Sequence, residues 1–290
     1  MNTDNTLKDL QQEFVTDLTK RGRASATILA YAKDLDQLIA YLASVDKTTP
    51  RDVAPSDIEM FRDSLRGKEY TDKSVSRKLN AVKTYFRWLV TQRLLENDPA
   101  APVAHPRYTN PAPRILARLE YRALRDTARE DERIAAIIEL MLQTGIRIGE
   151  VAALQLEDVK LDKIIIRAYE SQPEREIPVN GQAVQALERY LKVRPDTKTS
   201  HVFVTKTGRP LLVRNIRSSI DRYFQEAGIE NAKVNDLRNT FIAHQLKSGI
   251  DMVTVSRIAG HKRLSTTERY LQFVERKENG KKLGTKLEEL

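Results

Sequence analysis

The decisive stretch of this chain runs from residue 235 to residue 270 and reads NDLRNTFIAHQLKSGIDMVTVSRIAGHKRLSTTERY. It holds Arg238 in a helical pattern, then a Gly-His pair ending at His261, and then Tyr270 nine residues after that histidine. A further arginine, Arg147, lies upstream in the segment TGIRIGE. Singly these residues are ordinary, because a lone helical arginine is usually a surface charge. Their order and spacing make them candidates for one site.

These residue types suit attack on a phosphodiester. Arginine presents a permanently charged planar fork that fits phosphate oxygens, so Arg147 and Arg238 are candidate phosphate ligands. Tyr270 is the candidate nucleophile, and a tyrosine with its reference pKa of about 10 needs such an electropositive site to react as phenolate. His261 can donate a hydrogen bond to the same phosphate. The sequence contains neither a GxxxxGK[ST] loop nor an HExxH pattern, so we expect no nucleotide cofactor and no metal.

Composition and charge narrow the class of protein. The 290 residues carry a net charge of +9, which favours a polyanionic partner, with nucleic acid first and an anionic membrane surface second. The absence of cysteine excludes disulfides, thiolate catalysis and zinc-thiolate sites. No stretch approaches the roughly 20 apolar residues that span a bilayer. We therefore expect a cytoplasmic protein without membrane contact.

The N-terminal part reads as helical. The clearest segment is TDKSVSRKLNAVKTYFRWLVTQRLL, residues 71–95, in which apolar residues recur at helical spacing. Basic residues on and around its polar side are either a solvated surface or contacts to DNA phosphates. These candidate DNA-binding residues are Arg77, Lys78, Lys83 and Arg87.

A proline-rich segment divides the chain. Five prolines fall between Pro99 and Pro113, where they disfavour helix and predict a stiff linker. We therefore predict a helical DNA-binding domain over residues 1–98, a linker over 99–114, and a catalytic domain with a C-terminal tail over 115–290. In the second domain KIIIRAYE and REIPVN predict a hairpin, and HVFVTKTGRPLL predicts a third short strand. The expected fold class is mainly α with a small antiparallel sheet (α+β).

Together the motifs TGIRIGE, NDLRNTF, AGH and STTERY resemble the tyrosine recombinase (phage integrase) family, and the compact length resembles its Xer-type site-specific recombinases. The resemblance implies a SAM-like core-binding N-terminal domain followed by a catalytic domain. It implies that Tyr270 cleaves and rejoins duplex DNA through a 3′-phosphotyrosine, with Arg147, Arg238 and His261 on the scissile phosphate. It also implies integration or recombination of double-stranded DNA without a cofactor.

Two positions depart from the family pattern. Asn235 stands where the family has the first histidine of its His-x-x-Arg box, and an amide can donate to phosphate but cannot shuttle a proton near neutral pH. Glu170 stands where the family has a hairpin lysine, and no lysine lies between Lys163 and Lys192. The general acid is therefore in doubt. Arg175 matches a common family arginine and is expected to contact DNA or to support the site.

The resemblance leaves alternatives open. Loss of the lysine and histidine gives weight to a catalytically weakened or inactive DNA-binding protein of the same fold, and a topoisomerase-like strand cutter would use the same chemistry. Family members assemble as tetramers, so we expect a homo-tetramer on two DNA sites, joined by exchanged C-terminal tails. The tail after Tyr270, LQFVERKENGKKLGTKLEEL, would serve this purpose or be a frayed end.

Overall fold

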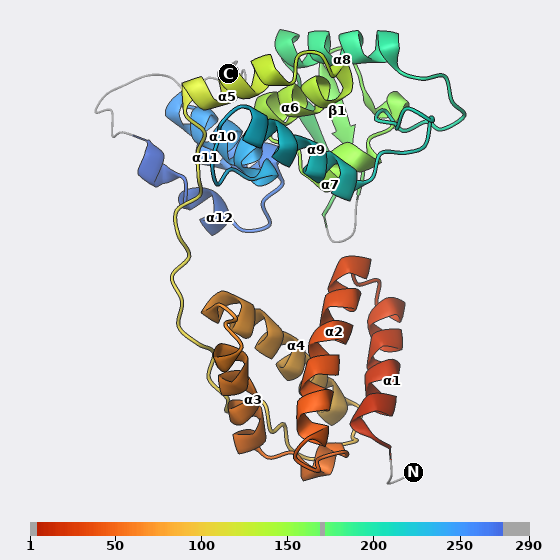
Figure 1. The fold of residues 1–290 in the computed structure, drawn as a ribbon, viewed down its shortest axis with the longest axis vertical. Coiled ribbons are helices and arrows are strands. Elements are labelled where there is room, and N and C mark those ends of the chain that lie inside the picture. The colour runs from red at the N-terminus through yellow and green to blue at the C-terminus, as the bar shows by residue number, and fades with distance from the viewer. Residues whose placement is uncertain (1–4, 169–171, 275–290) are drawn as a thin grey trace. The chain divides into compact units, whose positions relative to one another are not determined.

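A computed structural model of the protein describes residues 5–168 and 172–274, and the chain divides between Asn110 and Pro111 into two compact units (Figure 1). In its described residues, 5–110, unit 1 contains four α-helices and a short 3₁₀ turn, and its long helices pack on one another. The elements of unit 1 are α1 (Leu7–Lys20), α2 (Ser25–Ala43), η1 (Pro50–Asp52), α3 (Pro55–Gly67) and α4 (Asp72–Thr91).

Helix α4 forms the centre of unit 1. Thr71 caps its first turn by accepting a hydrogen bond from the Ser74 amide at 3.3 Å. Its apolar stripe is buried, and the Tyr85 hydroxyl donates to the Leu7 carbonyl at 2.9 Å. Phe14 of α1 packs edge-on against the Tyr85 ring, with ring centroids 5.4 Å apart. The helical character predicted from this segment is confirmed.

The start of the proline-rich segment packs on unit 1. Ala100 and Val103 are buried in its hydrophobic core, and the Lys83 ammonium donates to the Ala101 carbonyl at 3.0 Å. The Ser76 hydroxyl lies 3.1 Å from Nδ1 of His105. Apolar burial and side-chain hydrogen bonds therefore hold this part of the segment against the helices of unit 1. Composition alone predicts only that it is extended.

Unit 2 combines helices with one small sheet. Its elements are α5 (Arg118–Thr127), α6 (Glu132–Thr144), α7 (Ile148–Ala153), η2 (Leu156–Asp158), β1 (Lys163–Ile166), β2 (Arg175–Pro178), α8 (Gly181–Val193), α9 (Val213–Glu226), α10 (Val234–Lys247), α11 (Met252–Ala259), α12 (Ser265–Glu268) and η3 (Leu271–Phe273). The predicted fold class, mainly α with a small antiparallel sheet, is confirmed.

The sheet of unit 2 has two antiparallel strands within the described residues, with Lys163 opposite Pro178 and Ile166 opposite Arg175. The predicted third strand is wrong. Val202, Phe203 and Val204 are fully buried, but around them the chain makes only the isolated bridges His201 to Gln155 and Val204 to Pro210. Alternating β-branched residues here reflect burial in a loop and not pairing along a strand.

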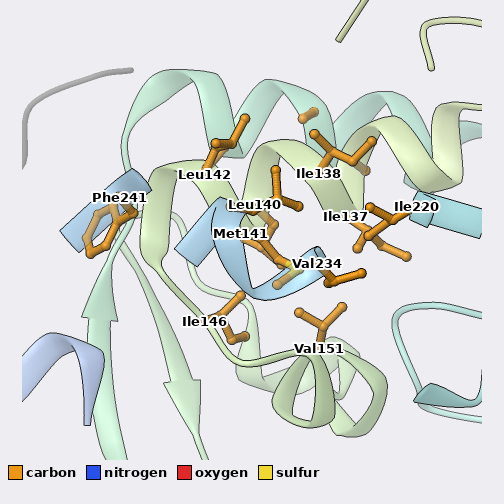
Figure 2. Close-up of a cluster of buried hydrophobic side chains, with 14 of the residues drawn as sticks. Ile137, Ile138, Leu140, Met141, Leu142, Ile146, Val151, Ile220, Val234 and Phe241 are labelled. Carbon is orange, nitrogen blue, oxygen red and sulfur yellow. The ribbon is translucent and has the colours of Figure 1, made fainter. Parts of the chain in front are cut away.

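Helix α6 is the core of unit 2. Its side chains are buried around most of the helix, and α8 and α10 pack against it (Figure 2). The helix ends at Gly145, whose φ of 62° is left-handed. A Cβ at this position would lie 2.3 Å from the Phe241 ring, so only glycine fits. This turn leads directly into the segment that holds Arg147.

Among the helices of the described residues, none combines the length and the apolar character that a membrane span requires.

Candidate active site

Arg147 stands at the start of α7 and is anchored on both sides. Its amide donates to Glu150 Oε2 at 2.9 Å, and its Nη1 donates to Glu150 Oε1 at 3.0 Å. Its Nη2 donates to the Gly260 carbonyl, just past the end of α11. The guanidinium is thereby fixed between two segments that are more than one hundred residues apart in the chain.

Arg238 lies on α10 and is 5% exposed. Its Nη1 donates to the Gly145 carbonyl and its Nη2 to the Ala259 carbonyl, the latter at 2.6 Å. These two carbonyls belong to the C-terminal ends of α6 and α11, where helix carbonyls lack intrahelical partners and the helix dipole is negative. Two helix ends therefore hold a buried cation in place without neutralising it.

The side chain of Arg175 is buried, which favours the supporting role among the two roles, DNA contact or support, that the sequence predicts. Its two terminal nitrogens bond both oxygens of Glu150 at 2.8 and 2.7 Å, and its Nε donates to the Ile258 carbonyl at 2.9 Å. Its side chain is 7% exposed. The structure thus places Arg175 behind the site, where it supports Glu150, and not on an open DNA-facing surface.

The cluster carries an excess of positive charge. Burial opposes ionisation of Glu150, but the hydrogen bonds and charges of Arg175 and Arg147 together outweigh it and lower the pKa of this carboxyl, which is therefore ionised. Burial and then the nearby Arg147 lower the pKa of Arg238 to about 9, which leaves the guanidinium charged at neutral pH. One carboxylate cannot balance three guanidiniums. The arrangement favours an anion such as a phosphate.

Gly260 makes room for the arginines. Its φ of 66° is left-handed, and a Cβ there would lie 2.9 Å from Nη1 of Arg147 and 2.9 Å from Cζ of Arg175. A side chain at this position would therefore strain the backbone and push both guanidiniums away. In the sequence this glycine is only the first residue of the Gly-His pair, and no local pattern indicates its contact with the arginines.

His261 follows directly and faces the tyrosine. Its Nδ1 lies 2.8 Å from the Thr267 hydroxyl, and its ring stacks on the Tyr270 ring at 6.4 Å between centroids and 17° between planes. Burial, with Arg238 and Arg147, lowers the pKa of His261 to about 4. His261 is therefore a neutral imidazole at neutral pH.

Tyr270 is held as a buried phenol. The residue is 6% exposed, and its hydroxyl donates to Oδ1 of Asn239 at 2.7 Å. Burial raises the pKa of Tyr270, against the opposing pull of Arg238. The tyrosine is therefore un-ionised, and its hydroxyl is directed at Asn239 of α10.

Asn235 lies at the edge of the same group. It is exposed, and its Nδ2 donates to Asn239 Oδ1 at 3.0 Å. It lines a pocket together with Arg217, Lys233 and Asp221, which leaves one positive charge in excess beside it. The five predicted catalytic residues, Arg147, Arg238, His261, Tyr270 and Asn235, are thus brought together in unit 2.

The sequence does not predict two residues of the site, Asn239 and Thr267, and one predicted residue, Glu170, has no described position. Asn239 directly follows Arg238 and was not singled out, and Thr267 was read only as part of a motif. Adjacency to an arginine is the one signal that points to Asn239. Glu170 lies outside the described residues. Within residues 5–168 and 172–274, no group of three or more His, Cys, Asp or Glu side chains is arranged to hold a metal.

The predicted DNA contacts of α4 differ in accessibility. Arg87 is exposed, and Arg77 has a half-exposed side chain that bonds both oxygens of the buried Asp34. Lys83 is half-buried, with its ammonium on the Ala101 carbonyl. Lys78 is 5% exposed and bonds Asp34 at 2.9 Å, so the structure places it inside unit 1 and not on a phosphate-facing surface.

Family models match both units. The Phage integrase family model covers residues 112–276, and the model of the Phage integrase N-terminal SAM-like domain covers residues 12–93. Tyrosine recombinase XerC of Roseiflexus sp. (strain RS-1) is 30% identical over 91% of this chain and 89% of the relative. Tyrosine recombinase XerD of Halalkalibacterium halodurans is 29% identical over 90% of this chain and 92% of the relative.

Solved structures share the fold. XerA recombinase is 27% identical and superposes with a TM-score of 0.51 over 91% of this chain and 93% of that chain. A lambda integrase dimer bound to a COC′ core site superposes with a TM-score of 0.75 over 97% of this chain and 100% of that chain. At 14% identity the second likeness concerns the fold alone.

Proposed function

The chain belongs to the phage integrase family and is a tyrosine-type site-specific DNA recombinase, and from this premise we propose that Tyr270 is its nucleophile. In the proposed reaction Arg147, Arg238 and His261 bind the scissile phosphate, and Asn235 donates to it from the edge of the site. The observation that carries the proposal is the uncompensated charge of three arginines around one carboxylate, directly beside a tyrosine.

The chemistry follows from these positions. The Tyr270 oxygen attacks phosphorus, its proton leaves, and the bond from phosphorus to the 5′ oxygen breaks. The product is a 3′-phosphotyrosine and a DNA 5′-hydroxyl, which takes up a proton. Because the covalent link conserves the diester, a 5′-hydroxyl can attack it in reverse and rejoin the strand without ATP. Preorganised arginines stabilise the charge that develops in the transition state.

We propose that unit 1 adds contacts to the DNA backbone through α4. Arg87 and Arg77 are open to solvent on this helix, and Lys83 is half-buried beside them. Lys78 is left out because its ammonium is buried on Asp34. Such contacts fix register on the duplex and make affinity depend on salt.

We propose a homo-tetramer on two DNA sites as the recombining assembly, acting in the cytoplasm. A lambda integrase tetramer bound to a Holliday junction superposes on this chain with a TM-score of 0.74, at 14% identity, which supports the fold but leaves the assembly as a proposal. Residues 275–290 lie outside the described residues. Their exchange between neighbouring copies is part of the same proposal.

The test uses a nicked suicide duplex carrying the protein's recombination site, found by selecting bound duplexes from a random pool. We expect wild type to form a covalent adduct that retains the DNA on the 5′ side of the break, and Tyr270→Phe to bind and form none. An inactive DNA-binding protein gives no adduct with wild type. A topoisomerase-like enzyme relaxes a supercoiled plasmid that lacks the site, whereas a recombinase does not. An adduct formed by Tyr270→Phe contradicts the proposal.

A further inference from the structure

A chain of hydrogen bonds connects the nucleophile to the edge of the phosphate site. The Tyr270 hydroxyl donates to Asn239 Oδ1 at 2.7 Å, and the amide of Asn235 donates to the same oxygen at 3.0 Å. Asn235 is exposed, whereas Asn239 is 5% exposed and Tyr270 is 6% exposed. Asn239 is therefore the buried link between an exposed amide and the tyrosine.

The orientation of the Asn239 amide is determined by Asp236. Nδ2 of Asn239 donates to Asp236 Oδ1 at 3.1 Å, and the other carboxylate oxygen accepts the Lys233 amide at 2.8 Å. The reverse orientation would set the Asn239 oxygen against a carboxylate oxygen and its NH₂ group against that of Asn235. The amide oxygen therefore faces the tyrosine, and the hydroxyl must be the donor.

We propose that Asn239 is a positioning residue for the recombination reaction, whose amide oxygen holds the Tyr270 hydroxyl as an un-ionised phenol. The proposal rests on the assignment of Tyr270 as nucleophile. An amide oxygen accepts a hydrogen bond but does not take up the proton, unlike a neutral imidazole or a carboxylate. The hydrogen bond to the neutral form disfavours ionisation. The proton of Tyr270 must therefore leave to a group other than Asn239 when DNA is cleaved.

The two substitutions at this position have opposite expected effects. Asn239→Leu removes the acceptor but keeps the branched shape of the side chain, so the neutral phenol loses its partner and ionises more readily. Asn239→Asp keeps an acceptor and adds a negative charge that opposes the phenolate. A hydrogen bond of ordinary strength corresponds to a shift of about one pH unit.

The experiment measures single-turnover cleavage of the nicked suicide duplex from pH 6 to pH 9.5 with the full-length protein in excess. We expect the rising limb of the profile to move down by about one pH unit in Asn239→Leu and to move up in Asn239→Asp. Thr240→Val is the matched control, because it removes a buried hydroxyl of the same helix that accepts from the Leu116 amide at 2.9 Å and makes no bond to Tyr270. Its limb should not move down. Unchanged limbs in both Asn239 variants, or an equal downward shift in Thr240→Val, overturn the proposal.

A second measurement covers the case in which Asn239→Leu cleaves too poorly for a profile. Melting temperatures of the DNA-free wild type, Tyr270→Phe, Asn239→Leu and the double variant form a double-mutant cycle. The proposal predicts that the double variant loses less than the sum of the single losses, because both remove one hydrogen bond. Additive losses overturn it. The melting temperatures do not depend on catalysis. Cleavage by Tyr270→Phe would therefore contradict the assignment of Tyr270 as nucleophile, but it would leave the result of the double-mutant cycle unaffected.

Discussion

Each unit of this protein contains a buried carboxylate that bonds two cations, but the two clusters differ in how far the charge is balanced. In unit 1, Asp34 is 2% exposed and bonds Arg77 and Lys78, and the Lys78 ammonium also donates to Gln37 at 2.8 Å. In unit 2, Glu150 is 4% exposed and bonds Arg147 and Arg175, while Arg238 lies beside them on helix carbonyls.

The difference separates a structural ion cluster from a binding site. The Asp34 cluster joins α2 to α4, and the Lys78 ammonium is enclosed by the Tyr70 ring, 4.8 Å from its centroid. In the Glu150 cluster, the backbone carbonyls at the ends of two helices accept hydrogen bonds from Arg238. Carbonyls carry no full charge, so the cluster still has excess positive charge. Buried charge without a counter-charge is costly, so an entering phosphate relieves the cluster of unit 2. The unit 1 cluster has one cation more than carboxylates, and water solvates that charge because the Arg77 side chain is half-exposed.

The largest expected effect is the loss of an arginine from the unit 2 cluster. Arg238→Ala removes a buried donor from the proposed transition-state site, and cleavage of the suicide duplex should fall by about 10³-fold. Binding should weaken only several-fold, because many phosphate contacts share the affinity. Single-turnover kinetics and a filter-binding titration measure the two quantities. Near-normal cleavage by Arg238→Ala would place the site elsewhere.

The second largest effect is expected when the carboxylate charge of each cluster is removed, because the two losses should affect different properties. Glu150→Gln leaves Arg147 and Arg175 without their common anchor, so cleavage at saturating DNA should fall by about 10²-fold. Asp34→Asn should instead lower the unfolding free energy by about 3 kcal/mol, because it strands the buried Lys78 ammonium. Its cleavage rate at saturating DNA should stay within a few-fold of wild type. Equal losses of cleavage in both variants would remove the distinction between the clusters.

A pair of glycines tests how closely the arginines are held. Gly260 and Gly228 have φ of 66° and 67°, so alanine strains both backbones equally. Only at Gly260 does the added Cβ meet arginines, and nothing lies within 4 Å of a Cβ at Gly228. Cleavage should fall about tenfold in Gly260→Ala and stay normal in Gly228→Ala, measured on equally folded samples. Equal rates would mean that arginine placement does not limit the reaction.

The smallest effect is expected on the surface of α4. Arg87→Glu should weaken DNA binding several-fold and reduce the slope of log affinity against log salt by about one. The control is Lys8→Glu on α1, whose ammonium pairs with Asp36 at 2.6 Å. The cleavage rate of both variants at saturating DNA should be unchanged. A salt slope that Arg87→Glu leaves unaltered would remove α4 from the proposed DNA contacts.

Helical periodicity in the sequence predicted α4 and the fold class, because buried positions recur along the helix. The same periodicity indicates that Lys78 faces the core. It lies three residues after Val75 and four before Val82 on the buried side of the helix. Its partner Asp34 is 44 residues away, and no local pattern identifies such a pair. Charge alone therefore suggested DNA contact where the fold demanded an internal ion pair.

The site was predictable where its residues follow one another in motifs and not where it depends on long-range contacts. Order and spacing selected Arg147, Arg238, His261 and Tyr270, which the structure places in one group. The burial of Arg175 on Glu150 and the acceptor role of Asn239 depend on how α7, α10, α11 and β2 pack. The third strand failed for a related reason, because buried β-branched residues do not by themselves supply a pairing partner.

The most direct test of the account is to locate the DNA on the protein. The trapped complex of wild type with the nicked suicide duplex is digested with nuclease and protease, and the peptide that carries the residual nucleotide is sequenced by mass spectrometry. The account predicts a phosphodiester on Tyr270, beside the uncompensated arginines of unit 2. A nucleotide on any other of the ten tyrosines would contradict it.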